Sequence, residues 1–344
     1  MNILIDIGHP AHVHLFKNFA KIMIDKGNSV LFTARDKEAI LDLLESYKMD
    51  YRVLGRHRKK LLSKLLTLFS YNYKLLNICK DFRPDIFLSH GSIYAAHVSA
   101  ILNKPHVSFE DTEHSIEQII LYRPFTDLIL TSDVFERDLG KKQKRYSGFH
   151  ELAYLHPKYY SPNYKIKEEL GLDKNEKFVL FRFVSWEATH DFGHTGLSLI
   201  DKRKLIKIVS KYAKIFVSSE TYLPHDLEPY RLTLPSEKIH DIMNAASLYI
   251  GEGATMASEC SVLGTPSIYV NNLNLGYINE QIKYGLVFQT ESIAEISRIA
   301  IKLLENPNLE AYYNDKRDKM ISEKIDVTEY LCNSLVSFNR SNNL

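Results

Sequence analysis

The sequence predicts an α/β fold built from two doubly wound, Rossmann-like parallel-sheet domains. Apolar, strand-like runs alternate with amphipathic helical stretches, and this order is typical of parallel sheets with helices on both faces. The alternation stops in residues 156–177, which hold two prolines and many polar groups, and then restarts. A chain of 344 residues has room for two such domains.

The break in the pattern sets the expected boundaries. We expect a first domain in residues 1–160, a linker in residues 161–177 and a second domain in residues 178–325. Residues 326–344 form an expected helical tail that could pack back on the first domain. Doubly wound sheets bind ligands at the carboxyl ends of their strands, so two such domains facing each other would hold a ligand in the cleft between them.

The elements of the first half follow from apolar runs and from the residues that end them. Gly27 follows the first helix in the manner of a C-cap, and Pro105 stops the last one. The expected strands are residues 2–6, 29–34, 85–88, 106–109 and 128–131, and the expected helices are residues 13–26, 37–47, 61–79 and 92–102.

The second half repeats the same alternation. The expected strands are residues 178–183, 214–218, 247–251 and 267–270, and the expected helices are residues 201–212, 238–246, 255–263 and 293–304, followed by a helical stretch in residues 309–338.

Composition excludes several classes of protein. The net charge of +2 does not argue for nucleic acid. The three cysteines lie far apart without a C-x-x-C spacing, which disfavours a disulfide framework or a zinc ribbon. No signal peptide and no apolar run of membrane-spanning length is recognisable, so we expect a cytoplasmic protein. A basic stretch, RHRKKLLSKLL from Arg56 to Leu66, is either a solvated helix face or a contact with the inner face of an anionic membrane or an acidic substrate.

The most informative stretch runs from Leu248 to Val270 and reads LYIGEGATMASECSVLGTPSIYV. We expect a strand that ends at Gly251, a tight turn, and a helix that begins near Thr255, which can cap it. Glycines in the turn let a ligand approach the main chain, and the helix N-terminus suits a phosphate. Glu259, one turn further on, could accept both hydroxyls of a ribose. The alternative is an ordinary strand-turn-helix with convenient glycines.

This stretch resembles the nucleotide-sugar motif of GT-B glycosyltransferases and the matching motif of the non-hydrolysing UDP-N-acetylglucosamine 2-epimerases. Nearly the whole chain resembles the DUF354 family, through GHPAHVH, LSHGS, SFEDTEH, RFVSWEATHD and GEGATMASE. The resemblance implies a GT-B fold in which Glu259 binds the ribose of a nucleotide sugar. It also implies that the turn and the helix start bind the diphosphate through Gly253, Ala254, Thr255 and Met256.

Two loops after expected strands of the first domain carry further candidates. His90 lies beside a capped turn that could hold a hydroxyl-rich acceptor or be purely structural. Glu110, Asp111, Glu113 and His114 lie within five residues, and carboxylates this close raise one another's pKa, which suits acid–base work. A capping loop with solvated acids is the alternative. VSFEDTEHS resembles the H-V-E-A-G-L-R pattern of the epimerases with Glu110 at the glutamate position, but the closing Arg has no counterpart.

The loop in residues 184–196 corresponds to the one that faces the donor phosphates and the acceptor in GT-B proteins. Its candidates for donor contact are Ser185 and Trp186, which could stack on a sugar or base or pack in the core. His190 and Asp191 are candidates for the cleft and, with His194, for a metal fragment. Glu220 is a further candidate for donor contact. The chain contains no D-x-D pair, which favours metal-independent handling of the diphosphate by backbone N–H groups.

The stretch GHPAHVH places three histidines within six residues after the first strand. His12 and His14 are spaced i, i+2 and would not share a helix face, so a three-imidazole metal site is strained. We expect Gly8 to line the cleft, His9 or His12 to act as a base or to contact the acceptor, and His14 to be structural.

These observations favour a metal-independent glycosyltransferase without a cofactor. It would move a sugar from a nucleoside-diphosphate sugar, bound by the second domain, to a hydroxyl of a glycan or lipid-linked glycan on the first. Its base would be His9, His12, Glu110 or Asp111. The alternatives are a sugar-nucleotide epimerase, with Glu110 and Glu113 as acid and base, and a catalytically silent nucleotide-sugar-binding protein.

Overall fold

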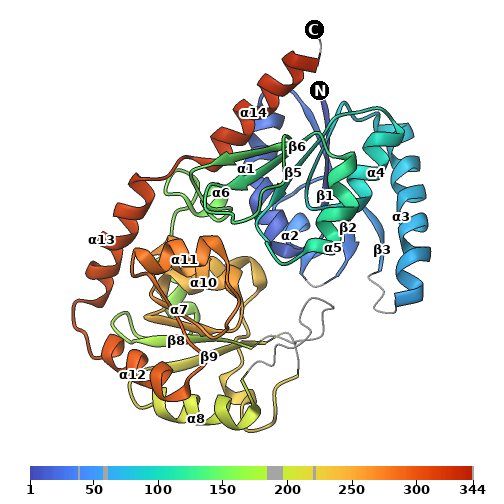
Figure 1. Ribbon diagram of the computed structural model, residues 1–344. Coiled ribbons are helices and arrows are strands. Elements are labelled where there is room, and N and C mark those ends of the chain that lie inside the picture. Colours follow the sequence, from blue (N-terminus) through green and yellow to red (C-terminus); the bar gives the residue numbers. More distant parts are fainter. Residues whose placement is uncertain (38, 57–60, 184–196, 220–221, 343–344) are drawn as a thin grey trace. The chain divides into compact units, whose positions relative to one another are not determined.

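A computed structural model describes residues 1–37, 39–56, 61–183, 197–219 and 222–342 (Figure 1). The chain forms two compact units, one of residues 1–154 with residues 325–344, the other of residues 155–324. The first unit therefore takes in the end of the chain, and its boundary lies a few residues before the predicted one. In the described part, no helix is long and apolar enough to cross a membrane.

The first unit is built on a seven-stranded sheet in the order β3-β2-β1-β4-β5-β6-β7, with every pair parallel. Its strands are β1 (Asn2–Ile7), β2 (Ser29–Asp36), β3 (Tyr51–Arg56), β4 (Ile86–His90), β5 (His106–Glu110), β6 (Leu128–Ser132) and β7 (Gln143–Tyr146). Its helices are α1 (Pro10–Asp25), α2 (Ile40–Ser46), α3 (Leu61–Phe82), α4 (Ile93–Ile101), α5 (Ile116–Tyr122), the short η1 (Arg123–Phe125), α6 (Leu152–Leu155) at the passage to the second unit, and α14 (Val327–Asn342).

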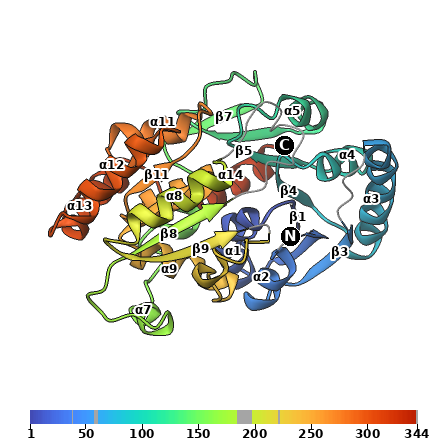
Figure 2. The same ribbon diagram turned by 90° about the horizontal axis from the view of Figure 1, so that it is seen from below.

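The second unit, in which Figure 2 labels β8, β9 and β11, is built on a five-stranded parallel sheet in the order β12-β11-β10-β8-β9. Its strands are β8 (Phe178–Phe183), β9 (Lys214–Ser219), β10 (Leu248–Gly251), β11 (Ser267–Tyr269) and β12 (Val287–Gln289). Its helices are α7 (Ile166–Glu169), α8 (Leu199–Val209), η2 (Glu228–Tyr230), η3 (Ser236–Lys238), α9 (Ile239–Ala245), α10 (Ala254–Leu263), α11 (Gly276–Lys283), α12 (Ile293–Leu304) and α13 (Leu309–Ser322).

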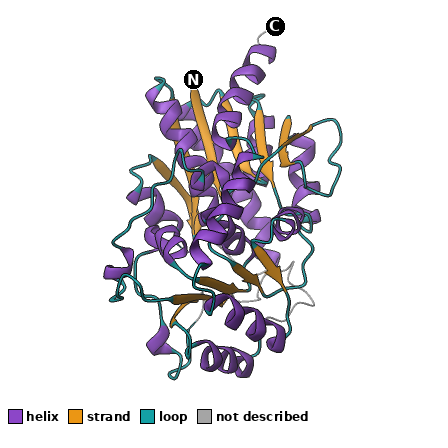
Figure 3. Ribbon diagram, turned by 90° about the vertical axis from the view of Figure 1, so that its left-hand side faces the viewer, coloured by secondary structure: helices purple, strands orange, loops and turns teal. Residues whose placement is uncertain are grey.

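Both units are doubly wound, with helices on both faces of the sheet (Figure 3), and the predicted fold class is confirmed. Continuous apolar runs such as Ile3–Ile5 are fully buried, as strands covered on both sides require. In each sheet the strand order reverses once, between β1 and β4 in the first unit and between β8 and β10 in the second. Ligands of doubly wound folds bind at such reversals.

The structure corrects several predicted elements. The first helix begins at Pro10 rather than at residue 13, because proline suits the first helical position and His9 caps the helix by accepting the Ala11 N–H on its Nδ1. Strands β3, β7 and β12 and helices α5 and α11 were not predicted. The predicted linker contains one short helix, α7, as its sequence leads us to expect, but it belongs to the second unit.

Candidate functional site

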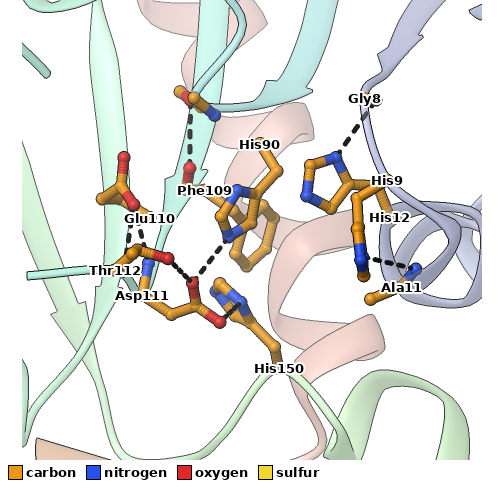
Figure 4. A network of polar contacts seen from close by, with 12 residues as sticks. Gly8, His9, Ala11, His12, His90, Phe109, Glu110, Asp111, Thr112 and His150 are labelled. Carbon is orange, nitrogen blue, oxygen red and sulfur yellow. Dashed lines mark hydrogen bonds and ion pairs between the residues drawn. The ribbon is translucent and has the colours of Figure 1, made fainter. Parts of the chain in front are cut away.

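The candidate site of the first unit lies at the carboxyl ends of β1, β4 and β5 and in the loop after β7 (Figure 4). Strand β1 leads into Gly8 and His9, β4 ends at His90, and β5 ends at Glu110. These strands are neighbours in the sheet, so residues far apart in the sequence meet at one edge.

The three histidines of GHPAHVH take different positions. His9 is exposed at the start of α1. His12, inside the first turn, is half-buried, and its Nδ1 accepts the N–H of Gly8 at 3.3 Å. His14 is buried, with its Nδ1 3.2 Å from the hydroxyl of Tyr47. The hydrogen bond of His14 agrees with its predicted structural role.

Asp111 lies between two histidines, one at the end of β4 and one in the loop after β7. Its Oδ1 is 3.0 Å from Nε2 of His90, and its Oδ2 is 3.0 Å from Nδ1 of His150. Thr112 also donates its hydroxyl to Oδ1 of Asp111. The ring of His12 stacks on that of His90, with centroids 4.4 Å apart. We refer to His12, His90, Asp111 and His150 as the histidine–aspartate cluster.

The charges of this cluster follow from its pairing. Burial disfavours the charged form of His90, but the charge of Asp111 and its hydrogen bond raise the pKa of His90 to about 9. Burial opposes ionisation of Asp111, yet His150 and His90 hold its pKa well below its usual value. At neutral pH, His90 is therefore an imidazolium paired with the Asp111 carboxylate.

The other two histidines are neutral. Burial, followed by the charge of His90, lowers the pKa of His12 well below 6.5. Burial also lowers the pKa of His150, although Asp111 opposes the shift. A neutral His150 donates its Nδ1 proton to Asp111, which leaves Nε2 as an acceptor that has no hydrogen-bond partner among the described residues.

Glu110 is enclosed. Its Oε2 accepts the hydroxyl of Tyr122 at 2.8 Å, and its Oε1 accepts the backbone N–H groups of Asp111 and Thr112. Burial raises the pKa of Glu110, partly offset by the charge of His90. The carboxyl group thus fastens the loop after β5. Further along the loop Glu113 is buried, Arg137 donates to its backbone carbonyl, and His114 is half-buried.

A second buried carboxylate organises the start of the site. Asp6 is fully buried at the end of β1 and accepts hydrogen bonds from Thr33, Arg35 and Ser92 at 2.8, 2.6 and 2.5 Å. Ser92 also caps α4. An added Cβ on Gly8 would lie 2.5 Å from Nη2 of Arg35, so a larger residue there would require the guanidinium to shift.

In the second unit, the GEGAT turn follows β10 as predicted, but α10 begins at Ala254 with Gly253 as its N-cap, not at Thr255. No side chain caps this helix. Its first residues are half-buried and the rest is buried, so the first turn is the part that reaches the surface. Uncapped N–H groups at a helix start are a ready anion site.

Two carboxylates flank this turn. Glu252 is buried, accepts the N–H of Leu197 and lies 3.5 Å from Nζ of Lys202. Glu259 is 4% exposed, and its Oε1 lies 3.0 Å from Nε2 of His240. The ribose contact predicted for Glu259 stays a prediction. Within the unit, Oε1 of Glu259 is already paired with His240.

Several predicted residues lie outside the described part of the chain: Ser185, Trp186, His190, Asp191, His194 and Glu220.

The residues of the described part that could hold a metal ion are His90, Asp111 and His150, since one ligand atom of each lies within 4.8 Å of the others. Two imidazoles and a carboxylate would suit Zn²⁺ or another divalent transition metal. Both histidines already hydrogen-bond to Asp111, however, so this set is paired without an ion.

Sequence reasoning missed three residues of the site: Asp6, Arg35 and His150. Asp6 and Arg35 stand near the carboxyl ends of predicted strands, so the rule that selected the other candidates could have found them. His150 follows β7, which was not predicted, because its sequence QKRY is short and polar.

Comparison with known proteins agrees with this architecture. A family model described as "Protein of unknown function (DUF354)" matches residues 1–334. An uncharacterised protein of Methanocaldococcus jannaschii is 25% identical over 314 residues, which cover 86% of this chain and 89% of that protein.

Two solved structures illustrate the likeness in fold. The UDP-GlcNAc 2-epimerase of Neisseria meningitidis bound to UDP-GlcNAc is 14% identical with a TM-score of 0.68, covering 98% of this chain and 100% of that one. A spinosyn rhamnosyltransferase complexed with thymidine diphosphate is 12% identical with a TM-score of 0.65, covering 97% of this chain and 100% of that one. At these identities the likeness shows the fold alone, which is the one shared by GT-B glycosyltransferases and these epimerases.

Proposed function

The chain belongs to the DUF354 family, whose description names no activity, and we propose that it is a glycosyltransferase. It transfers a sugar from a nucleoside-diphosphate sugar to a hydroxyl of a glycan or lipid-linked glycan, in the synthesis of a surface polysaccharide or glycolipid. The observation that carries the proposal is the histidine–aspartate cluster, because it holds a neutral imidazole, His12, beside an imidazolium–carboxylate pair.

In the proposed reaction, His12 acts as the general base. Nδ1 is its unprotonated nitrogen, and the long hydrogen bond from the Gly8 N–H is the one that an acceptor hydroxyl would replace. The acceptor oxygen forms a bond to the anomeric carbon, the bond from that carbon to the diphosphate oxygen breaks, and the acceptor proton passes to His12. The other candidates are less suited, because Asp111 is ion-paired, Glu110 is enclosed and His9 caps α1.

The leaving diphosphate carries the electron pair away. The uncapped start of α10 supports its binding there, because backbone N–H groups and the helix dipole stabilise negative charge without a cation. In this proposal, His12 takes the proton that the acceptor loses, and the start of α10 stabilises the charge that the diphosphate gains.

The proposal is tested by incubating the protein with UDP- and dTDP-sugars, with and without polyprenyl-phosphate-linked or free oligosaccharide acceptors. Nucleoside diphosphate should appear only when an acceptor is present. Conversion of a sugar nucleotide alone, with solvent deuterium entering the sugar, would instead identify an epimerase. Binding without either reaction would identify a silent binding protein.

The metal-independence of the reaction gives a prediction. Treatment with EDTA followed by desalting is expected to leave the transfer rate unchanged, because the His90–Asp111–His150 set is paired without an ion. A rate that falls and is restored by Zn²⁺ or Mn²⁺ would turn these three residues into a metal site and contradict the expectation.

The ribose contact expected for Glu259 gives a second prediction. Glu259→Ala is expected to weaken the binding of nucleoside diphosphate by about tenfold or more, as loss of a charge-assisted hydrogen bond does. Isothermal titration of the folded variant measures the effect, with Glu237→Ala, an acid exposed on η3, as the matched control. An unchanged affinity would show that Glu259 serves only His240.

A further inference from the structure

Apolar side chains crowd on the outside of four consecutive helices of the first unit. Half of the sixteen large apolar side chains exposed in the described residues come from α3, α4, α5 and η1 or the residue after α4. We call this set the apolar face; its members are Phe69, Tyr73, Ile101, Leu102, Ile116, Ile120, Leu121 and Phe125. Clustering of this kind marks an interaction surface, whereas single exposed apolar residues do not.

Helix α4 lies beside α3 and α5 (Figures 1 and 2). It also contacts η1. His97 of α4 joins them. Its Nδ1 lies 3.4 Å from Nδ2 of Asn72 on α3, its Nε2 lies 3.2 Å from the backbone oxygen of Leu121, and its ring centroid lies 4.7 Å from that of Phe125.

Helical spacing extends this junction into one surface. Phe69 precedes Asn72 by three residues and Tyr73 by four, so it is the neighbour of both on the surface of α3. On α4, Ile101 follows His97 by one turn. Side chains of three helices therefore meet around His97.

The apolar face is not needed for the core. The same helices bury other side chains, among them Leu75, Val98, Ile119 and Tyr122. A helix on the surface of a soluble protein normally has polar and charged residues on the face that is turned away from the core and towards water. Here 72% of Phe69, 66% of Tyr73 and 64% of Ile120 are exposed instead.

Positive charge is concentrated in the sequence that leads into α3. Residues 51–80, which include the start of α3, contain eight lysines and arginines and no acidic residue. The whole chain has a net charge of only +2, so the remaining residues are together acidic. Lys104 and Arg123 are exposed next to the apolar residues of α4 and η1.

We propose that the apolar face docks on an anionic lipid bilayer. Apolar side chains enter the headgroup boundary while flanking lysines and arginines bind anionic lipids, and each term alone is weak. A second copy of the chain fits less well, because pairing of two such faces would bring two cationic stretches together. The inference rests on the proposed function only in that a lipid-linked acceptor is the substrate that docking would serve.

The test is sedimentation of the full chain with large vesicles of phosphatidylcholine alone or mixed with phosphatidylglycerol, without substrate. We expect binding to the mixed vesicles that weakens with salt. The affinity of the variant Phe69→Ser, Tyr73→Ser, Ile120→Ser for the mixed vesicles should be lower by about tenfold or more, since three exposed apolar side chains are lost. The matched control, Tyr164→Ser, Ile200→Ser, Tyr222→Ser, removes three even more exposed apolar side chains of the second unit and should bind as the parent does.

Equal binding by the two triple variants would overturn the proposal, and so would absence of binding to mixed vesicles. A dimer in light scattering that only the Phe69 variant dissociates would assign the face to a second copy instead. Because no substrate is present, failure here leaves the glycosyltransferase assay unaffected, and a silent assay leaves vesicle binding unaffected.

Discussion

His12→Gln is expected to lower kcat by about 100-fold or more, the usual cost of losing a general base. The side chain stacks on His90, and burial together with the positive charge of His90 lowers the pKa of His12 and keeps it neutral. Because the pKa of His12 lies well below 6.5, the acidic limb of the pH–rate profile should also lie below 6.5 and vanish in the variant.

His9→Ala is the matched comparison, since both histidines belong to GHPAHVH. His9 is exposed and caps α1, so its loss should cost about 1 kcal/mol of stability and change kcat by less than about tenfold. Steady-state kinetics and thermal unfolding of both variants separate the two roles. A larger loss of kcat in the His9 variant would reverse the assignment of the base.

The second prediction concerns Asp111→Asn and the pH dependence of stability. The folded-state pKa of His90, about 9, lies above the value of about 6.5 in an unfolded chain. The stabilisation from this shift is fully present below pH 6.5 and is lost as the pH rises through 9. It amounts to about 3 kcal/mol, and Asp111→Asn removes its source.

The difference in unfolding free energy between parent and variant should therefore be largest near pH 6 and shrink by about 3 kcal/mol towards pH 10. Asp111 adds a second pH dependence on the acidic side. Because its pKa is lowered in the fold, its carboxylate stabilises the fold above pH 4, and this stabilisation is lost as the pH falls further. Urea titrations across this range measure both. Asp226→Asn, which breaks an exposed pair with Arg203, serves as control and should have little effect at any pH. A pH-independent difference for Asp111→Asn would mean that His90 is uncharged.

The alternation of strands and helices predicted the fold class, and the ends of the strands predicted where most candidate site residues lie. The long apolar strands bury both faces, so hydrophobicity marks them directly, and their carboxyl ends located His12, His90 and Asp111 without any structure. Strand β7 escaped because the edge of a sheet needs little apolar sequence, and His150 was lost with it. The sequence also could not predict which side chains pair with each other. Glu110 is paired with Tyr122 and Glu259 with His240, and both pairs depend on contacts between separate elements.

The start of α1 shows how one residue misleads local reasoning. The expected helix begins at residue 13, whereas Pro10 occupies the first helical position, where a missing N–H costs nothing. His12 thereby moves from a loop onto a helix, which fixes its distance from His90.

The closing segment of the chain has a consequence for the order in which the protein is made. Residues 325–344 complete the first unit: Ile325 donates its N–H to the carbonyl of Ser147, Thr328 donates its hydroxyl to that of Ala153, and α14 packs on α1. On the ribosome, the first unit emerges early but must wait until the entire second unit has been synthesised. The unit that carries His12 at the start of α1 is therefore completed only after the second unit has been synthesised.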